Sequence, residues 1–195
     1  MADNIGKIKA IALDFDGVIV NLDLDWKAAI CQASAISGYD IKSLILFYEE
    51  QFGTPIFEKI SGEMETLELH ALRTSPILPH VKEAIEMLAQ KNIDLYIVSM
   101  QSQRVIKQFL EQHGLEVYFK EIVTREKCPG KKAQVTYVLK QAGINPIQLL
   151  LIDDSKRNIS LCSELGVACF HFQNKAGLFR KSVTEESWEK IVASI

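Results

Sequence analysis

Residues 8–18 read Ile-Lys-Ala-Ile-Ala-Leu-Asp-Phe-Asp-Gly-Val, an apolar run that ends in two acidic residues separated by one position. The apolar part predicts a buried β-strand over about Ile8 to Asp14. Side chains two residues apart leave a strand on the same side, so Asp14 and Asp16 can face one small space. Two anions held there repel each other and raise each other's pKa. A divalent cation, or a reaction that uses both groups, explains such an arrangement.

A second apolar strand with an acidic end lies far along the chain. Residues 149–152 read Leu-Leu-Leu-Ile, and Asp153 and Asp154 follow them directly. This strand repeats the pattern of the first one. The two acidic ends together indicate one site for a phosphate group and a metal ion.

The composition is that of an ordinary globular protein. The chain has 195 residues, of which 48% are hydrophobic and 24% are charged, so it can form one domain or one domain with a modest insertion. Its net charge is −3, and we expect no nucleic-acid partner because there is no general basic field. The four cysteines show no metal-binding spacing, which favours reduced thiols.

The N-terminal residues lack the basic and apolar segments of a signal peptide. No apolar run approaches the roughly 20 residues that a membrane-spanning helix needs. We therefore expect a soluble cytoplasmic protein with no membrane partner. The sequence predicts no particular oligomeric state.

The pattern of apolar residues divides the chain into an early helical stretch and a later alternation. Residues 24–75 have helical periodicity with no clear strand, with breaks at Gly38 and at residues 53–55. Helices and strands alternate after Pro79. The predicted helices are Trp26–Ser37, Ile41–Phe52, Ser61–Arg73, Val81–Gln90, Ser102–Gln112, Lys131–Ala142, Lys156–Leu165 and one from Ser182 to about Ala193, where Ser182 and Glu185 fit a capping box. The predicted later strands are Ile93–Ser99, Glu121–Val123, Leu149–Asp153 and Val167–Phe172.

Alternating strands and helices predict an α/β fold with a parallel sheet covered by helices on both faces. In such sheets, ligands bind beyond the C-terminal ends of the strands. Asp14, Ser99, Asp153 and Asp154 all lie at predicted strand ends of this kind. We expect residues 1–20 and 77–195 to form a Rossmann-like core, and residues 21–76 to form a helical cap inserted after the first strand.

Phosphoryl transfer is a reaction that these positions can support. A phosphomonoester is anionic near neutral pH, and a hard cation such as Mg²⁺ offsets the repulsion of an anionic nucleophile. Asp14, the main-chain carbonyl of Asp16, Asp153 and Asp154 can supply oxygen ligands. Asp14 can then be the nucleophile, because a carboxylate is already ionised at neutral pH.

The other groups that such a reaction needs are also present. Asp16 fits a general acid that protonates the leaving alcohol and then a base that activates water. Ser99, after the apolar residues 94–98, offers a hydroxyl donor to the phosphate. Lys131, at the start of a predicted helix, offers a fixed cation.

The order Asp-x-Asp, Ser, Lys and Asp-Asp resembles that of the haloacid dehalogenase-like hydrolase superfamily. Its first motif, Asp-x-Asp-Gly-Thr/Val, matches residues 14–18, and Ser99 matches the Ser or Thr of the second. Lys131 matches the third motif, and residues 153–158, Asp-Asp-Ser-Lys-Arg-Asn, match the fourth. The resemblance covers about residues 8–172, with the helical insert where the family's C1-type cap sits. It implies a Rossmann-like core, magnesium dependence and an aspartyl-phosphate intermediate.

Three motifs depart from the common pattern of that family. Met100 and Gln101 follow Ser99, where many relatives have Asn directly after the Ser or Thr. The third motif lacks the common Lys-Pro; we choose Lys131, and Lys132 and Lys127 are the alternatives. Asp154 aligns with the usual metal ligand, whereas Asp153 stands where many members have Gly and can bind a metal directly or through water.

We therefore predict a magnesium-dependent phosphatase acting on a small phosphorylated metabolite. Asp16 favours a phosphatase or a phosphomutase, because dehalogenating members lack this second Asp. A sugar-phosphate mutase is one alternative, and a phosphate-binding regulatory protein with little turnover is another. The aromatic side chains of the insert can line the substrate cavity, although packing inside the cap is the preferred interpretation; they are Trp26, Phe47, Tyr48, Phe52 and Phe57.

Overall fold

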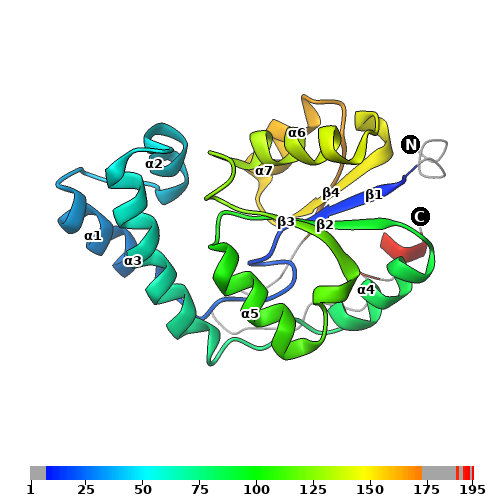
Figure 1. Ribbon diagram of the computed structural model, residues 1–195, viewed down its shortest axis with the longest axis horizontal. Helices are drawn as coiled ribbons and strands as arrows, with labels where there is room; N and C mark the ends of the chain where they lie inside the picture. The colour runs from blue at the N-terminus through cyan, green and yellow to red at the C-terminus, as the bar shows by residue number, and fades with distance from the viewer. Residues whose placement is uncertain (1–7, 173–187, 189–190, 194) are drawn as a thin grey trace.

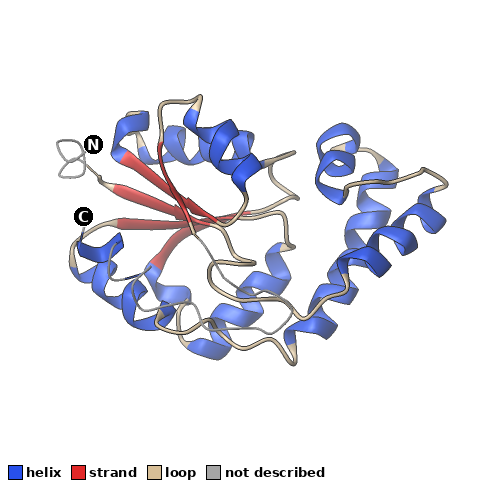
Figure 2. Cartoon of the chain, turned by 180° about the vertical axis from the view of Figure 1, so that it is seen from behind, coloured by secondary structure: helices blue, strands red, loops and turns tan. Residues whose placement is uncertain are grey.

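A five-stranded parallel sheet forms the centre of the computed structural model, which describes residues 8–172, 188, 191–193 and 195. The strand order is β3-β2-β1-β4-β5 (Figures 1 and 2). The strands are β1 (Ala10–Leu13), β2 (Asp94–Val98), β3 (Phe119–Val123), β4 (Leu149–Asp153) and β5 (Ala168–His171). Strands β2 and β3 lie on one side of β1, and strands β4 and β5 lie on the other side. The strand order therefore changes direction between β1 and β4, and parallel sheets of this kind bind ligands at that point.

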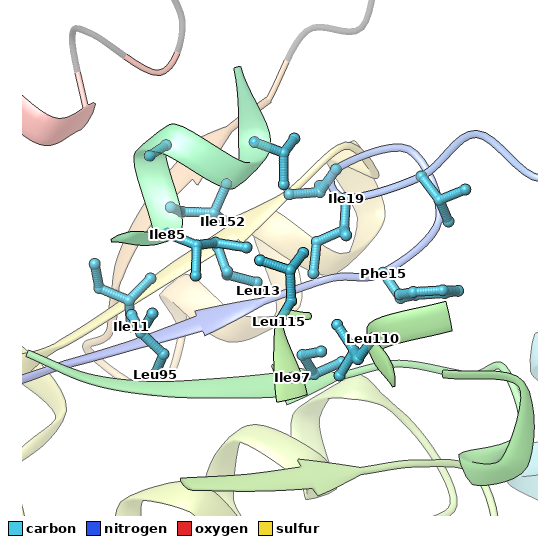
Figure 3. Packing of buried hydrophobic residues seen from close by; sticks show 14 of the residues in the cluster. Ile11, Leu13, Phe15, Ile19, Ile85, Leu95, Ile97, Leu110, Leu115 and Ile152 are labelled. Carbon is cyan, nitrogen blue, oxygen red and sulfur yellow. The ribbon is translucent and has the colours of Figure 1, made fainter. Parts of the chain in front are cut away.

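Helices cover both faces of the sheet (Figure 1). One face carries α4 (Val81–Gln90) and α5 (Gln103–His113), and the other carries α6 (Lys131–Ala142) and α7 (Lys156–Ser163). Alternate residues of each strand contribute to the two hydrophobic clusters, as the period of two in a strand requires. In β1, Ile11 and Leu13 pack toward α4 and α5 (Figure 3), whereas Ala10 and Ala12 pack toward α6 and α7.

Four helices lie between β1 and β2 in the chain, and we call the first three the helical insert: α1 (Trp26–Ser37), α2 (Leu44–Gln51) and α3 (Pro55–Leu72). They stand beyond one end of the sheet (Figures 1 and 2). They share a hydrophobic cluster of their own, which includes Ala33, Phe47, Phe57 and Met64. The insert is therefore a packed unit rather than a long loop.

The predicted α/β fold with an all-parallel sheet is confirmed, and α1, α4, α6 and β4 have the predicted bounds. The predicted start of α3 at Ser61 is wrong. Thr54 is its N-cap and accepts a hydrogen bond from Phe57 N at 3.2 Å, and Pro55 occupies the first turn. Proline is favoured at that position because its missing N–H has no helical partner there, so it starts this helix instead of breaking one.

The remaining described segments are short. Two 3₁₀ helices, Glu116–Tyr118 and Pro146–Gln148, precede β3 and β4. Most of the helix predicted from Ser182, including its capping box, lies outside the described residues; Trp188 and residues 191–193 are helical, and Trp188 is buried against the core. In the described part of the chain, no helix is both long and apolar enough to cross a membrane.

Candidate active site

Three carboxylates meet where β1 and β4 end. Leu13 pairs with Ile152 in the parallel register, so the residues that follow them, Asp14 and Asp153, emerge side by side. Each of Asp14, Asp153 and Asp154 offers a carboxylate oxygen, and these three oxygens lie within 4.8 Å of one another. The two acidic strand ends, 139 positions apart in the chain, thus form one cluster.

Lys131 lies against this cluster. It is the first residue of α6 and is 2% exposed, and its Nζ is 3.1 Å from Asp14 Oδ1 and 3.1 Å from Asp153 Oδ2. The same ammonium group donates a hydrogen bond to the carbonyl of Val98, at the end of β2. A single buried cation therefore links three strand ends.

The two alternative lysines lie elsewhere. Lys132 forms an exposed ion pair with Glu164 at 2.9 Å, and Lys127 pairs with Glu121. Of the three candidates, the structure brings only Lys131 to the acidic cluster.

Both oxygens of Asp153 already accept hydrogen bonds. Oδ1 accepts from Ser155 N at 2.8 Å, and Asn158 Nδ2 lies 3.1 Å from Oδ1 and 3.0 Å from Oδ2. The other end of that amide, Asn158 Oδ1, is buried and has no hydrogen-bond partner. A buried carbonyl oxygen without a partner beside three carboxylates suits a cation or its bound water.

The charges in the cluster do not balance. Burial raises the pKa of Asp14 well above its ordinary value, against the lowering effect of Lys131, and burial together with the charge of Asp153 raises the pKa of Asp154. Burial alone disfavours the charged form of Lys131, but Asp14 and Asp153 outweigh it and raise the pKa of its ammonium group. Three carboxylates thus face one ammonium group. Together with the unpartnered Asn158 oxygen, this shows that the residues fit a bound divalent cation.

Asp16 lies in the loop that leaves β1. Its Oδ1 accepts a hydrogen bond from Leu22 N at 2.9 Å, and burial is the main cause that raises its pKa from 3.8 to about 7. The carboxyl group of Asp16 is therefore poised to exchange a proton near neutral pH.

Gly17 makes the close approach of the β1 and β4 loops possible. Its φ is +83°, and a Cβ atom there would lie 2.2 Å from Asp154 Oδ2. A larger residue would strain the backbone and displace Asp154 from the cluster.

Ser99 follows β2 and is fully buried. Its hydroxyl donates a hydrogen bond to the side-chain carbonyl of Gln101. Met100 and Gln101 line the cavity described below, whereas Ser99 lies behind them. Gln101 therefore comes between the predicted hydroxyl donor and the cavity.

A buried ion pair that the sequence reasoning missed joins the helical insert to the core. Arg125 follows β3 and donates hydrogen bonds to Glu68 Oε1 at 2.6 Å, Ser61 Oγ at 2.8 Å and Met100 O at 2.9 Å. Ser102 N donates to the other oxygen of Glu68 at 3.1 Å. The position of Arg125 after an apolar strand was a signal that could have found it; Glu68, in the middle of a helix, carries no comparable signal.

A cavity of about 350 Å³ opens between the cluster and the helical insert. The core contributes Asp14, Asp16, Lys131 and Asp154 among others, and the insert contributes residues that include Trp26 and Tyr48. Phe47 and Phe57 instead pack inside the insert, as preferred from the sequence, and Phe52 is 36% exposed. Of the predicted site residues, Asp14, Asp16, Lys131 and Asp154 therefore line one concave space, whereas Asp153 and Ser99 are fully buried and are not part of its lining.

The parallel sheet covered by helices on both faces and the cavity at its strand ends, lined by carboxylates and a buried lysine, define a Rossmann-like α/β protein with a polar site at its strand ends. The chain matches the haloacid dehalogenase-like hydrolase family over residues 11–172. It therefore belongs to that family, and the predicted enzyme class, a phosphoric monoester hydrolase of this kind, is confirmed.

Individual relatives are distant in sequence. A phosphoglycolate phosphatase of Vibrio vulnificus strain YJ016 is 28% identical over 189 residues, covering 84% of this chain and 83% of that protein. One from Vibrio cholerae is 24% identical over 190 residues, with 85% and 83% covered.

Solved structures share the fold. A HAD phosphatase from Thermococcus onnurineus has a TM-score of 0.62 at 16% identity, covering 87% of this chain and 88% of that one. CbbY from Rhodobacter sphaeroides in complex with phosphate has a TM-score of 0.60 at 16% identity, with 94% and 96% covered.

Proposed function

We propose that this protein is a magnesium-dependent phosphatase that hydrolyses a small phosphorylated metabolite through an aspartyl-phosphate on Asp14. One observation carries the proposal: the ammonium group of Lys131 lies 3.1 Å from both Asp14 Oδ1 and Asp153 Oδ2. A phosphoryl group in transfer needs a fixed cation beside its nucleophile, because negative charge spreads over its oxygens.

The reaction takes two steps. The carboxylate of Asp14 attacks phosphorus, the bond to the ester oxygen breaks, and Asp16 gives its proton to the leaving oxygen. Asp16 then removes a proton from a water that attacks phosphorus, which releases phosphate and restores the Asp14 carboxylate. A carboxyl group whose pKa is raised to about 7 suits both roles.

The remaining polar residues bind and orient. Asp14, Asp154 and the main-chain carbonyl of Asp16 would hold Mg²⁺, while Asp153, whose oxygens accept several hydrogen bonds, orients Lys131 and Asn158 or reaches the ion through water. When bound, the ion offsets the repulsion between Asp14 and the phosphate.

Two side chains behind the phosphate position complete the site. The Ser99 hydroxyl donates to the Gln101 side chain and holds it in place, and the Gln101 amide group donates to the phosphate oxygens.

The helical insert acts in this proposal as a cap that covers the cavity and excludes water during the reaction. Residues 21–76 form the cap, and residues 1–20 and 77–195 form the catalytic core. The four cysteines are free thiols, which favours a reducing compartment such as the cytoplasm. Phosphoglycolate, which the Vibrio relatives are named for, is one substrate to test.

The test is phosphate release from a panel of phosphorylated metabolites, with Mg²⁺ and with EDTA. We expect release only with the metal, and a loss of about a thousandfold or more in Asp14→Asn, since the nucleophile is gone. Asp94→Asn is the matched control, because Asp94 is a half-exposed aspartate at the opposite end of β2. Interconversion of sugar phosphates without net release would instead favour a phosphomutase, and an inert wild type would favour a binding protein.

A further inference from the structure

The wall of the cavity that faces Asp14 is largely apolar. The helical insert contributes the side chains of Trp26, Ile30, Leu44 and Ile45, and the core adds Met100. The cavity volume, about 350 Å³, lies at the lower end of the range for small-molecule sites, roughly 300–1,000 Å³. This wall would contact the alcohol portion of a phosphomonoester whose phosphate lies at Lys131.

Few charges lie along this wall. Among the described residues that line the cavity, the charged side chains outside the group formed by Asp14, Asp16, Lys131 and Asp154 are Glu68 and Lys42.

Neither of these two charges suits an anionic alcohol portion. Glu68 is negative and buried against Arg125. The side chain of Lys42 is 80% exposed and pairs with Asp40 at 2.8 Å, so its charge lies at the rim and in water. A carboxylate on the alcohol portion of the substrate would therefore lose its bound water without gaining a buried cation as a partner.

Tyr48 also lines the cavity, but its hydroxyl oxygen is fully buried and is therefore not available to a ligand there. The Arg125 guanidinium lies 5.3 Å from the centroid of the Tyr48 ring. Tyr48 thus adds no charge and no accessible donor to the wall.

We propose that the substrate is the phosphate ester of an uncharged, partly apolar alcohol. This inference rests on the proposed phosphatase function. The proposed substrate differs from phosphoglycolate, for which the Vibrio relatives are named. The alcohol portion of phosphoglycolate carries a carboxylate. The phosphate end of the site is common to both kinds of substrate, and the difference lies in the wall formed by the helical insert.

The test uses pairs of probes that differ only in charge. The probes are phosphoglycolate and its amide, γ-phosphooxybutyrate and its amide, and n-butyl phosphate, each assayed with Mg²⁺ for kcat/KM. We expect each amide to exceed its carboxylate by about tenfold or more, the size of effect that one pocket group produces. A ratio of one or less at both chain lengths would overturn the inference while leaving the phosphatase in place. Release from none of the five would overturn the proposed function and the inference with it.

Two variants locate the preference in the wall. Ile45→Lys places a cation at a half-buried position of the lining and should shift the amide-to-carboxylate ratio toward the carboxylate by about tenfold. The neutral control Ile45→Met should leave the ratio unchanged. If both variants behave alike, the wall does not set the preference and the inference fails.

Discussion

Replacing Glu68 by Gln removes the negative charge that faces Arg125 inside the protein. The two side chains are 1% and 0% exposed, and their closest atoms are 2.6 Å apart. Arg125 also donates to Ser61 and Met100, so it is tied to both the helical insert and the loop after β2. Glutamine keeps the size and one acceptor oxygen of Glu68 but leaves the guanidinium charge uncompensated.

The expected loss follows from this burial. A buried ion pair adds little net stability, and burial indeed raises the pKa of Glu68 against the opposing effect of Arg125. Removing one partner nevertheless costs about 3–5 kcal/mol, because a buried charge is left alone. Since the amide oxygen of Gln still accepts a hydrogen bond, we expect a loss near the lower end, about 3 kcal/mol.

The assay is equilibrium unfolding in urea at neutral pH with EDTA, followed by tryptophan fluorescence and far-ultraviolet circular dichroism. Glu65→Gln is the matched control, because Glu65 lies on the same helix and pairs with Arg104 across 3.4 Å at the surface, where Arg104 is 71% exposed. Exposed pairs contribute below about 1 kcal/mol. Equal losses in the two variants would refute the reasoning that Glu68 and Arg125 form a buried joint between insert and core.

Further predictions concern the acidic cluster. Lys131→Ala should lower kcat for phosphate release by about 10²–10³-fold, whereas Lys132→Ala should change it less than about twofold; similar losses in both would exclude Lys131 as the phosphate-binding lysine. Because burial raises the pKa of Asp16 from 3.8 to about 7, the metal-free protein loses stability as pH rises between these values. Asp16→Asn should therefore stabilise the EDTA-treated protein to urea above about pH 7, by at most about 4 kcal/mol, and not below about pH 4; a gain that does not change with pH would contradict this. Gly17→Ala should weaken Mg²⁺ binding, measured by calorimetry, because its Cβ would meet Asp154 Oδ2; unchanged affinity would show that Asp154 is not a ligand.

The sheet and the position of the acidic cluster could be predicted because they depend on local patterns. Apolar runs of four residues mark β1, β2 and β4. Asp14 and Ser99 directly follow β1 and β2, and Asp153 is the last residue of β4. Parallel strands place these ends at one edge whatever the details of packing. The family motifs added the expected roles, and the fold supplied the distances.

Other features depend on contacts between distant segments. Lys131 and Lys132 are neighbours in sequence, and only their positions in the first turn of α6 send one to Asp14 and the other to Glu164. The partnership of Arg125 with Glu68 spans 57 positions and requires the insert to dock on the core. Such pairings depend on tertiary packing between distant segments. No local pattern in a single sequence predicts which of these residues will meet.

The most direct test of the account is to locate the phosphoryl group on the enzyme during turnover. The wild type would be mixed with a ³²P-labelled phosphomonoester and Mg²⁺, quenched in acid and mapped by peptide digestion. The account predicts a hydroxylamine-sensitive label on Asp14 that is absent from Asp14→Asn. A label on another residue, or one that persists in Asp14→Asn, would contradict it.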